Sequence, residues 1–174
     1  LFESGSGLIE AEVGQQDGVK VQLVRPRIFE RDGELKLPKQ KLSFTFLDTG
    51  VPHVVIFVKD LEKAEVFETG KAVRNHPHFQ PFGANVNFVE VKSKKEIAVR
   101  TYERGVEHET LACGTGSTAA AVVSVLKGFA QAPVHVLTKS GETLRIDIRK
   151  KDAEIGKVFL EGKAQFVYKG EYYS

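Results

Sequence analysis

Cys113 is the only cysteine of the chain, and its neighbours are residues that can support acid–base chemistry. Gly114 and Gly116 flank the thiol without side chains that would keep a ligand from the backbone. Thr115 and Ser117 add hydroxyl groups on either side of the second glycine. A lone cysteine often packs as a small structural hydrophobe. Here the flanking glycines and hydroxyls favour a functional thiol instead.

A helix is expected directly after this thiol. Residues 117–126 read Ser-Thr-Ala-Ala-Ala-Val-Val-Ser-Val-Leu, a run without a polar face, which predicts a buried helix. Lys127 and Gly128 supply its terminal charge and its stop. Cys113 would then lie at the helix N-terminus, where free N–H groups favour a carboxylate or a phosphate. The same position is expected to lower the pKa of the thiol.

Three kinds of chemistry are open to such a thiol. A protease nucleophile needs a histidine partner and an oxyanion hole, and the chain contains no recognisable protease motif. A metal site needs more ligands than one cysteine and scattered histidines provide, so we expect no metal. Proton transfer remains: a thiol or thiolate can exchange a proton with a carbon acid whose carboxylate is held by the helix N-terminus.

Four other residues are candidates for the same site. Glu103 and Arg104 are adjacent charges that are usually solvated, but beside the thiol they could read a zwitterion, Glu103 binding an ammonium and Arg104 a carboxylate. Asn85, at the start of an expected strand, either contacts a ligand or forms an Asx turn. His53 opens an apolar strand, where a structurally satisfied histidine is the commoner case.

Alternating and apolar runs predict most of the remaining chain as strands. We expect strands at 7–13, 19–24, 42–47, 53–58, 85–91, 96–102, 134–138, 144–148, 157–160 and 164–168. Turns or loops are expected at 15–18, 25–40 and 76–83, a short helix after Asp60, and another over 67–74. The pattern predicts an α+β fold in which a curved, mostly antiparallel sheet is wrapped around one central buried helix.

Composition narrows the class of protein. The 174 residues are 41% hydrophobic and 28% charged, which is typical of a globular domain. No apolar run approaches the roughly 20 residues that span a bilayer, and a net charge of +2 gives no reason to expect a nucleic-acid partner. One cysteine excludes an internal disulfide framework, so a cytoplasmic location is expected. Because methionine is absent, even at position 1, we expect a fragment of a larger protein.

Several stretches of the chain resemble diaminopimelate epimerases. The most specific is Tyr102-Glu103-Arg104-Gly105 followed by Glu109-Thr110-Leu111-Ala112-Cys113-Gly114-Thr115-Gly116; the others are Pro52-His53-Val54-Val55 and Phe82-Gly83-Ala84-Asn85-Val86-Asn87-Phe88. Their order and spacing are similar to those of the family's C-terminal half over essentially all of residues 1–174. On this resemblance the last strand, about 157–168, would belong to an N-terminal domain that the chain lacks.

The resemblance implies a cofactor-independent isomerase, requiring no pyridoxal phosphate, that interconverts LL- and meso-diaminopimelate for lysine and peptidoglycan synthesis. One cysteine takes the α-proton and a second delivers another on the opposite face; Cys113 matches the second cysteine. Gly114 and Thr115 match positions that hold the reacting carboxylate, Asn85, Glu103 and Arg104 match substrate-binding residues, and His53 and Glu103 match groups that tune the thiol pKa. The implied partners are a small-molecule substrate, the N-terminal half of the same enzyme and, as in many family members, a second copy in a homodimer.

Three departures from the family pattern are visible. Val51 stands where the family usually has asparagine, the 106–109 loop is one residue longer than the commonest form, and the domain with the partner cysteine is absent. Two alternatives therefore stay open. One is a related cysteine-dependent racemase of the proline or hydroxyproline type, and the other is a non-catalytic domain that binds a small anion.

Overall fold

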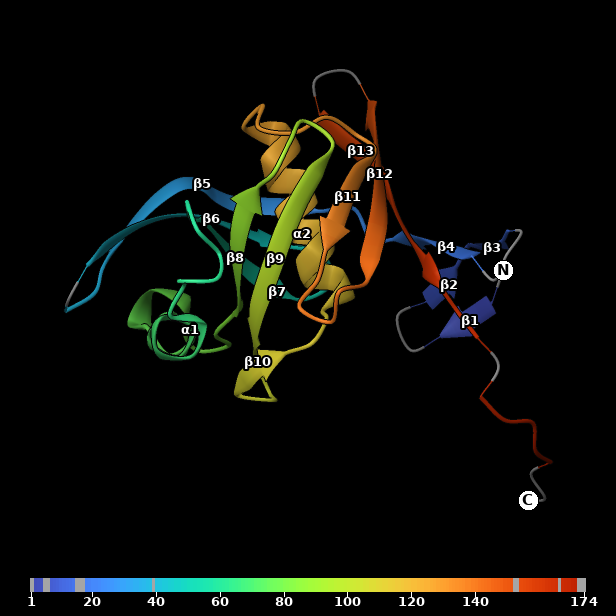
Figure 1. The fold of residues 1–174 in the computed structure, drawn as a ribbon, viewed down its shortest axis with the longest axis horizontal. Helices are drawn as coiled ribbons and strands as arrows, with labels where there is room; N and C mark the ends of the chain where they lie inside the picture. The colour runs from blue at the N-terminus through green and yellow to red at the C-terminus, as the bar shows by residue number, and fades with distance from the viewer. Residues whose placement is uncertain are drawn as a thin grey trace.

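The computed structural model describes residues 2–4, 7–14, 18–38, 40–151, 154–165 and 167–171. Over these residues the chain forms strands, two α-helices and one 3₁₀ turn, in the α+β class expected from the sequence (Figure 1). The helices are α1 (Val66–Arg74) and α2 (Gly114–Leu126), and the 3₁₀ turn is η1 (Pro77–Phe79). The strands are β1 (Phe2–Ser4), β2 (Gly7–Ile9), β3 (Ala11–Val13), β4 (Gly18–Leu23), β5 (Arg27–Lys36), β6 (Lys41–Asp48), β7 (Pro52–Phe57), β8 (Asn85–Val91), β9 (Glu96–Glu103), β10 (His108–Thr110), β11 (Val134–Leu137), β12 (Thr143–Lys151) and β13 (Glu154–Lys163).

One sheet contains nearly all of these strands. Its order is β3-β4-β13-β12-β11-β9-β8-β7-β6-β5, with β10 paired to β9, while β1 and β2 form a separate pair. The neighbours are antiparallel except for β7 with β8 and β9 with β11, which are parallel. The parallel pairs arise because the chain crosses over through α1 between β7 and β8, and through α2 between β9 and β11. The sheet is therefore mixed, with antiparallel pairs in the majority.

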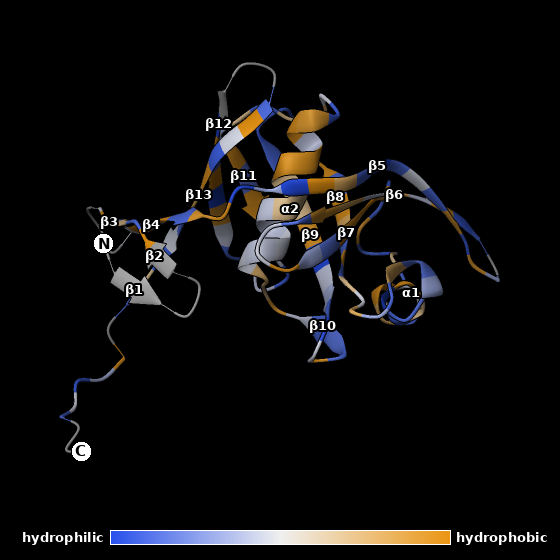
Figure 2. Cartoon of the chain, turned by 180° about the vertical axis from the view of Figure 1, so that it is seen from behind, coloured by the Kyte–Doolittle hydropathy of each residue, from blue (hydrophilic) through white to orange (hydrophobic). Residues whose placement is uncertain are grey.

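Helix α2 lies in the larger of two hydrophobic clusters and contacts β6, β7, β8, β9, β11, β12 and β13. Figure 2 shows its C-terminal turns as strongly hydrophobic and its N-terminal turn as less so. The cluster has as its members Leu47, Val55, Val89, Ile97, Val99, Ala119–Val123, Ala130, Val134, Val136, Ile146, Ile148, Ile155 and Val158. Burial on all sides explains why the helix sequence has no polar face, as the sequence predicted.

Helix α1 covers the other face of β8 and β9 and buries a second cluster that includes Val66, Val73, Val86 and Tyr102. Gly70 makes this packing possible, since a Cβ atom there would lie 2.5 Å from Tyr102 Cβ. The helix matches the expectation for residues 67–74. The short helix expected after Asp60 is wrong: Asp60 Oδ1 accepts a hydrogen bond from Lys63 N (3.3 Å) in a turn.

Two other expectations for local structure are wrong. Residues 25–40 were expected to be a loop, but β5 pairs antiparallel with β6 from Arg27 to Lys36. Residues 164–168 were expected to be a strand, but β13 is one continuous strand from Glu154 to Lys163, and residues 164, 165, 167 and 168 are in no strand. Residue 166 lies outside the described residues. Of the turn expected at 15–18, residues 15–17 lie outside the described ones; β3 and β4, which flank it, pair antiparallel as a hairpin does.

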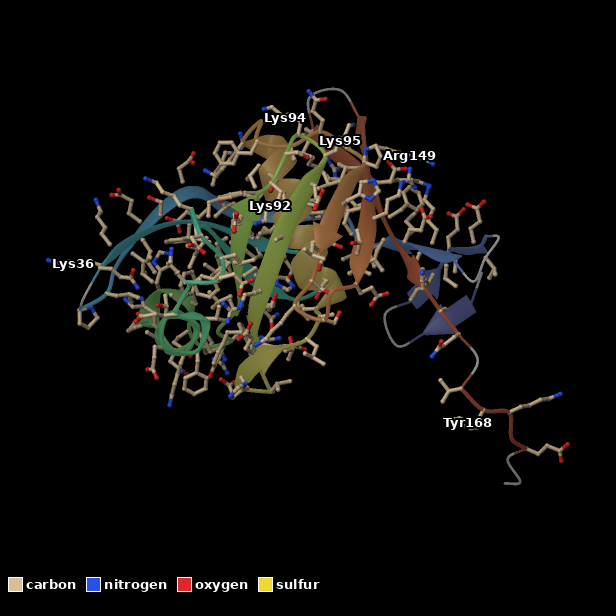
Figure 3. The ribbon with its side chains drawn as sticks, viewed as in Figure 1. Lys36, Lys92, Lys94, Lys95, Arg149 and Tyr168 are labelled. Carbon is tan, nitrogen blue, oxygen red and sulfur yellow. The ribbon has the colours of Figure 1, made fainter. Side chains whose placement is uncertain are left out.

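The strands β1–β4 and the C-terminal tail lie together on one side of the body, away from α1 and the long β5–β6 hairpin (Figure 1). Strand β13 connects this region to the body, because it lies between β12 and β4 in the sheet. Tyr168 in the tail is 86% exposed (Figure 3). Among the described residues, neither helix is long and apolar enough to cross a membrane.

Candidate acid–base site at the start of helix α2

Cys113 is the N-cap residue of α2, with an extended backbone (φ −136°, ψ 108°). Its carbonyl accepts the first helical hydrogen bond from Ser117 N (2.8 Å), but its side chain caps no backbone N–H. The Sγ atom lies 3.6 Å from Thr115 Oγ1. The sulfur is half-buried and Gly114 beside it is exposed, so the thiol lies at the surface end of an otherwise buried helix.

The expectation that the helix terminus lowers the pKa of this thiol is wrong for the described structure. Burial raises the pKa of Cys113 above its usual value, and the Glu103 carboxylate acts in the same direction. The Thr115 hydroxyl and the nearby Gly116 and Thr115 amides act in the opposite direction and lower the pKa of the thiol, but they do not outweigh burial. The raised pKa favours the protonated form of the Cys113 thiol at neutral pH.

The two charged candidates lie where β9 turns toward β10. Glu103, the last residue of β9, accepts a hydrogen bond from Thr110 Oγ1 (2.9 Å). Arg104 donates through its backbone N to Asn85 Oδ1 (2.9 Å) and through Nη1 to the Phe82 carbonyl (3.1 Å). The turn closes when Glu107 N donates to the Glu103 carbonyl (2.8 Å). These bonds hold both charged residues in place beside the start of β8.

Asn85 is buried and joins distant segments instead of forming an Asx turn. Its Nδ2 donates to the Pro52 carbonyl (3.1 Å), while its Oδ1 accepts from Arg104 N. It thereby ties the start of β7 to the end of β9 across the parallel β7–β8 pair. Val51, just before β7, has an apolar side chain and supplies no polar contact of the kind an asparagine would make there.

His53 lies directly beside Asn85 in the strand register and is fully buried. Its Nδ1 is 3.1 Å from Asn87 Nδ2. Burial lowers the pKa of His53 to about 3, and the positive charge of Arg104 adds to this effect. His53 is therefore a neutral imidazole at physiological pH, and any influence it has on a thiol is that of a hydrogen-bonding group, not of a cation.

Sequence reasoning missed two buried polar residues next to these candidates. Asn87 and Thr101 face each other across β8 and β9, and Thr101 Oγ1 donates to Asn87 Oδ1 (3.0 Å). Asn85 and Asn87 are two residues apart on one strand and so share the sheet face that meets α2. Two asparagines with this spacing at the start of a mostly apolar strand are the signal that would have found the second one.

Glu109 is part of the characteristic sequence around Cys113 but has a structural role in the described fold. It forms a bidentate ion pair with Arg100 (2.6 and 2.9 Å) and a second pair with Lys139 (2.7 Å). Burial alone would raise the pKa of Glu109, but the hydrogen bonds from Arg100 and Lys139 outweigh it, and the pKa lies below its usual value. The carboxylate thus fastens β10 to β9 and to the segment after β11.

This ion pair predicts a pH-dependent stability. The pKa of Glu109 is lower in the folded than in the unfolded chain. The ionised carboxylate therefore contributes its full amount to the free energy of unfolding above the ordinary glutamate pKa, and this contribution is lost as the pH falls through the folded-state pKa. We expect Glu109→Gln to destabilise the fold by about 1–3 kcal/mol at pH 7, with a smaller deficit in acid. Urea denaturation at several pH values measures this. A deficit that stays constant from neutral to acidic pH would contradict it.

The prominent lysines lie elsewhere. Lys92, Lys94 and Lys95 cluster at the β8–β9 turn, at the far end of β9 from Glu103 (Figure 3). Lys94 Nζ donates to the Gly128 carbonyl (2.8 Å) and Lys95 Nζ to the Ala132 carbonyl (3.0 Å). Lys94 and Lys95 thus fasten the segment after α2 to this turn, and none of the three lysines is among the candidate site residues.

Two further observations concern the surroundings of the candidate residues. A surface cavity of about 590 Å³ lies between β5–β7 and residues 127–129, and none of the candidate residues lines it. Within the part of the chain that the structure describes, no three His, Cys, Asp or Glu side chains are grouped to hold a metal ion.

Sequence comparison identifies close relatives. The sequence model of the family "Diaminopimelate epimerase" matches residues 45–167. The chain is 49% identical over 171 residues to the diaminopimelate epimerase of Aquifex aeolicus, covering 97% of this chain and 60% of the relative. It is 43% identical to that of a Hydrogenobaculum species and 41% identical to that of Chlorobaculum tepidum, covering 98% and 97% of this chain. The chain spans about 60% of the length of these relatives.

Solved structures share the fold at much lower identity. A hydroxyproline epimerase from Agrobacterium vitis superposes with a TM-score of 0.74 at 16% identity, covering 92% of this chain and 55% of that one. A probable proline racemase from Agrobacterium radiobacter gives a TM-score of 0.70 at 15% identity, covering 96% and 59%. At these identities the likeness concerns the fold alone.

Proposed function

The chain belongs to the diaminopimelate epimerase family, and we propose that the protein containing it interconverts LL- and meso-diaminopimelate without a cofactor. The observation that carries the proposal is the position of Cys113, a protonated thiol at the N-cap of a buried helix with Glu103 nearby. A thiol so placed can deliver a proton to a carbon whose carboxylate is bound by the helix amides. The product would enter lysine and peptidoglycan synthesis.

Five residues around Cys113 bind the substrate or act on the thiol in this proposal. Gly114 and Thr115 bind the reacting carboxylate through the first turn of α2, where a negative charge is favoured. Arg104 binds a carboxylate and Glu103 an ammonium group of the zwitterion. Asn85, fastened between Pro52 and Arg104, contacts the substrate with its remaining hydrogen-bonding capacity. Burial is the main reason that the pKa of the Cys113 thiol is raised, and the Glu103 carboxylate adds to this effect, which supports its assignment as a pKa-modulating residue.

A single thiol reaches one face of the α-carbon, so the reaction needs a second acid–base group on the other face. We propose that residues 1–174 are the C-terminal part of a longer cytoplasmic protein whose N-terminal part supplies the partner cysteine. The chain spans about 60% of the length of its relatives, which supports this proposal. We place β1–β4 and the end of β13 next to that missing part, because they lie apart from the body (Figure 1).

Two further features complete the proposal. We infer that the sheet curves around α2 as its central helix, which the contacts of α2 with β6–β9 and β11–β13 support.

We also propose that the longer protein forms a homodimer, as implied by the resemblance of its sequence to the family. Gel filtration with light scattering measures this mass, and a monomer at working concentration would overturn it.

The proposal predicts a substrate preference that can be measured directly. The longer protein is incubated in deuterated water with LL-diaminopimelate, L-proline and trans-4-hydroxy-L-proline, and deuterium at the α-carbon is measured by mass spectrometry. We expect exchange with diaminopimelate only. Glu103 can bind an ammonium group and Arg104 a carboxylate, and diaminopimelate carries two of each, whereas proline and hydroxyproline carry one. The 174-residue chain, assayed alone, should give little exchange.

Two outcomes would decide against the proposal. Exchange with proline or hydroxyproline but not with diaminopimelate would assign the protein to the related racemases. Binding of diaminopimelate without exchange of its α-proton would favour the non-catalytic anion-binding domain.

A further inference from the structure

Asn87 is a fully buried side chain in the middle of β8, and all of its hydrogen-bonding groups are engaged or enclosed. Its Nδ2 lies 3.1 Å from the Val54 carbonyl and 3.1 Å from His53 Nδ1. Its Oδ1 accepts from Thr101 Oγ1 at 3.0 Å. A carboxamide held by three partners on the two neighbouring strands, β7 and β9, has one orientation, which makes it a rigid element of the sheet.

This orientation determines the tautomer of His53. A carbonyl oxygen accepts hydrogen bonds only, so the atom facing Val54 O must be the amide nitrogen. The same nitrogen donates its second proton to His53 Nδ1, which must therefore carry a lone pair. The proton of the neutral imidazole then resides on Nε2. The low pKa of His53, about 3, agrees with an imidazole that stays neutral.

The Nε2–H so created is buried and has no hydrogen-bond partner among the described residues. A buried donor without an acceptor costs about 1–3 kcal/mol, so such groups are rare unless they serve a purpose. The donor is close enough to Arg104 for that charge to influence the pKa of His53.

Asn87 also touches the first turn of α2. A Cβ atom built on Gly116 would overlap Asn87 Oδ1 and would lie 3.1 Å from Cys113 Sγ. The carboxamide oxygen and the sulfur therefore approach the same point of the helix backbone from two sides. Any displacement of Asn87 would alter both the packing of the first turn of α2 against β8 and the hydrogen bond to His53.

We propose that Asn87 is a positioning residue of the site, which fixes His53 as the Nε2–H tautomer and seats the start of α2 beside Cys113. The proposed function leaves the tautomer of His53 open, and Asn87 determines it. It rests on the proposed function only for its consequence in catalysis, since the tautomer and the helix seat are properties of the fold.

The test is a pair of long-range ¹H–¹⁵N correlation spectra, which distinguish the two neutral tautomers of histidine from each other and from imidazolium. At pH 7 we expect the His53 signals of the wild-type 174-residue chain to show the Nε2–H form. In Asn87→Asp the carboxylate cannot donate to Nδ1, so we expect His53 to move to the Nδ1–H form or to imidazolium. Asn75→Asp makes the same chemical change at an exposed asparagine and should leave the His53 signals unchanged.

The wild-type spectrum alone can overturn the proposal, so the test does not depend on the folding of the variant. An Nδ1–H tautomer or an imidazolium in the wild-type chain would refute it, as would an unchanged Nε2–H tautomer in a folded Asn87→Asp chain. Because no substrate is involved, an Nε2–H tautomer in a protein that fails to exchange the α-proton of diaminopimelate would overturn the proposed function only.

Discussion

Replacing Cys113 with serine should stabilise the chain while abolishing α-proton exchange in the longer protein. Cys113 occupies the N-cap of α2 with extended backbone angles, yet its side chain caps no N–H. Serine is a preferred N-cap residue, and its Oγ can accept from the Thr115 or Gly116 amide, for a gain of about 0.5–1 kcal/mol. A serine hydroxyl cannot replace a thiol as an acid near neutral pH, so exchange should fall about 10²–10⁴-fold.

Urea denaturation of the 174-residue chain measures the stability, and deuterium incorporation by the longer protein measures the exchange. Cys113→Ala is the matched control, because it removes the thiol without adding a cap: exchange should be lost equally, with no gain in stability. Exchange in Cys113→Ser within tenfold of wild type would mean that the thiol is not the proton donor. A serine variant less stable than the alanine variant would indicate a structural cysteine.

Helix α2 could be predicted from the sequence because its evidence is local. The apolar run after Gly116, the alanines within it and the stop at Lys127–Gly128 belong to one segment, and the observed helix Gly114–Leu126 follows them closely. The position of Cys113 at its start follows from the same segment. The direction of the thiol pKa could not be predicted in this way, because burial by distant parts of the chain outweighs the local amides.

Strand β5 shows where local evidence misleads. Pro26, Asp32-Gly33 and Pro38 suggest a loop, but both prolines lie outside the paired residues Arg27–Lys36. Gly33 faces the ring of Phe44 on β6, and a Cβ atom there would overlap that ring. The register of β5 shifts on either side of Glu30, so the strand keeps its pairing despite an irregular sequence. Long-range pairing with β6 therefore decides the structure here.

The parallel pairing of β7 with β8 explains why the proximity of two site residues could not be predicted from local sequence patterns. His53 and Asn85 lie 32 positions apart in sequence and become neighbours only through the parallel register of β7 and β8. Alternation along each strand cannot reveal which strands are adjacent or in which direction they run. The resemblance to a family supplied that information for His53 and Asn85. It supplied none for Asn87, whose importance follows from contacts with His53 and Gly116.

Gly116→Ala is expected to destabilise the chain by about 1–3 kcal/mol, although alanine is ordinarily the better helix former by about 0.5–1 kcal/mol. The added Cβ would overlap Asn87 Oδ1, which cannot retreat because Thr101, Val54 and His53 hold the carboxamide. The start of α2 must then shift away from the sheet and carry Cys113 with it. Exchange by the longer protein should fall along with the stability.

Gly114→Ala provides the matched control within the same helical turn. A Cβ atom there would lie 3.4 Å from Leu160 Cδ1, an ordinary contact, so urea denaturation should show a stability equal to or above that of the wild-type chain. Asn87→Ala removes the obstructing oxygen, and adding Gly116→Ala to it should cost less than in the wild-type background. If the two costs are equal, Asn87 does not seat the helix. If Gly114→Ala and Gly116→Ala behave alike, the close approach of α2 to β8 has no energetic importance.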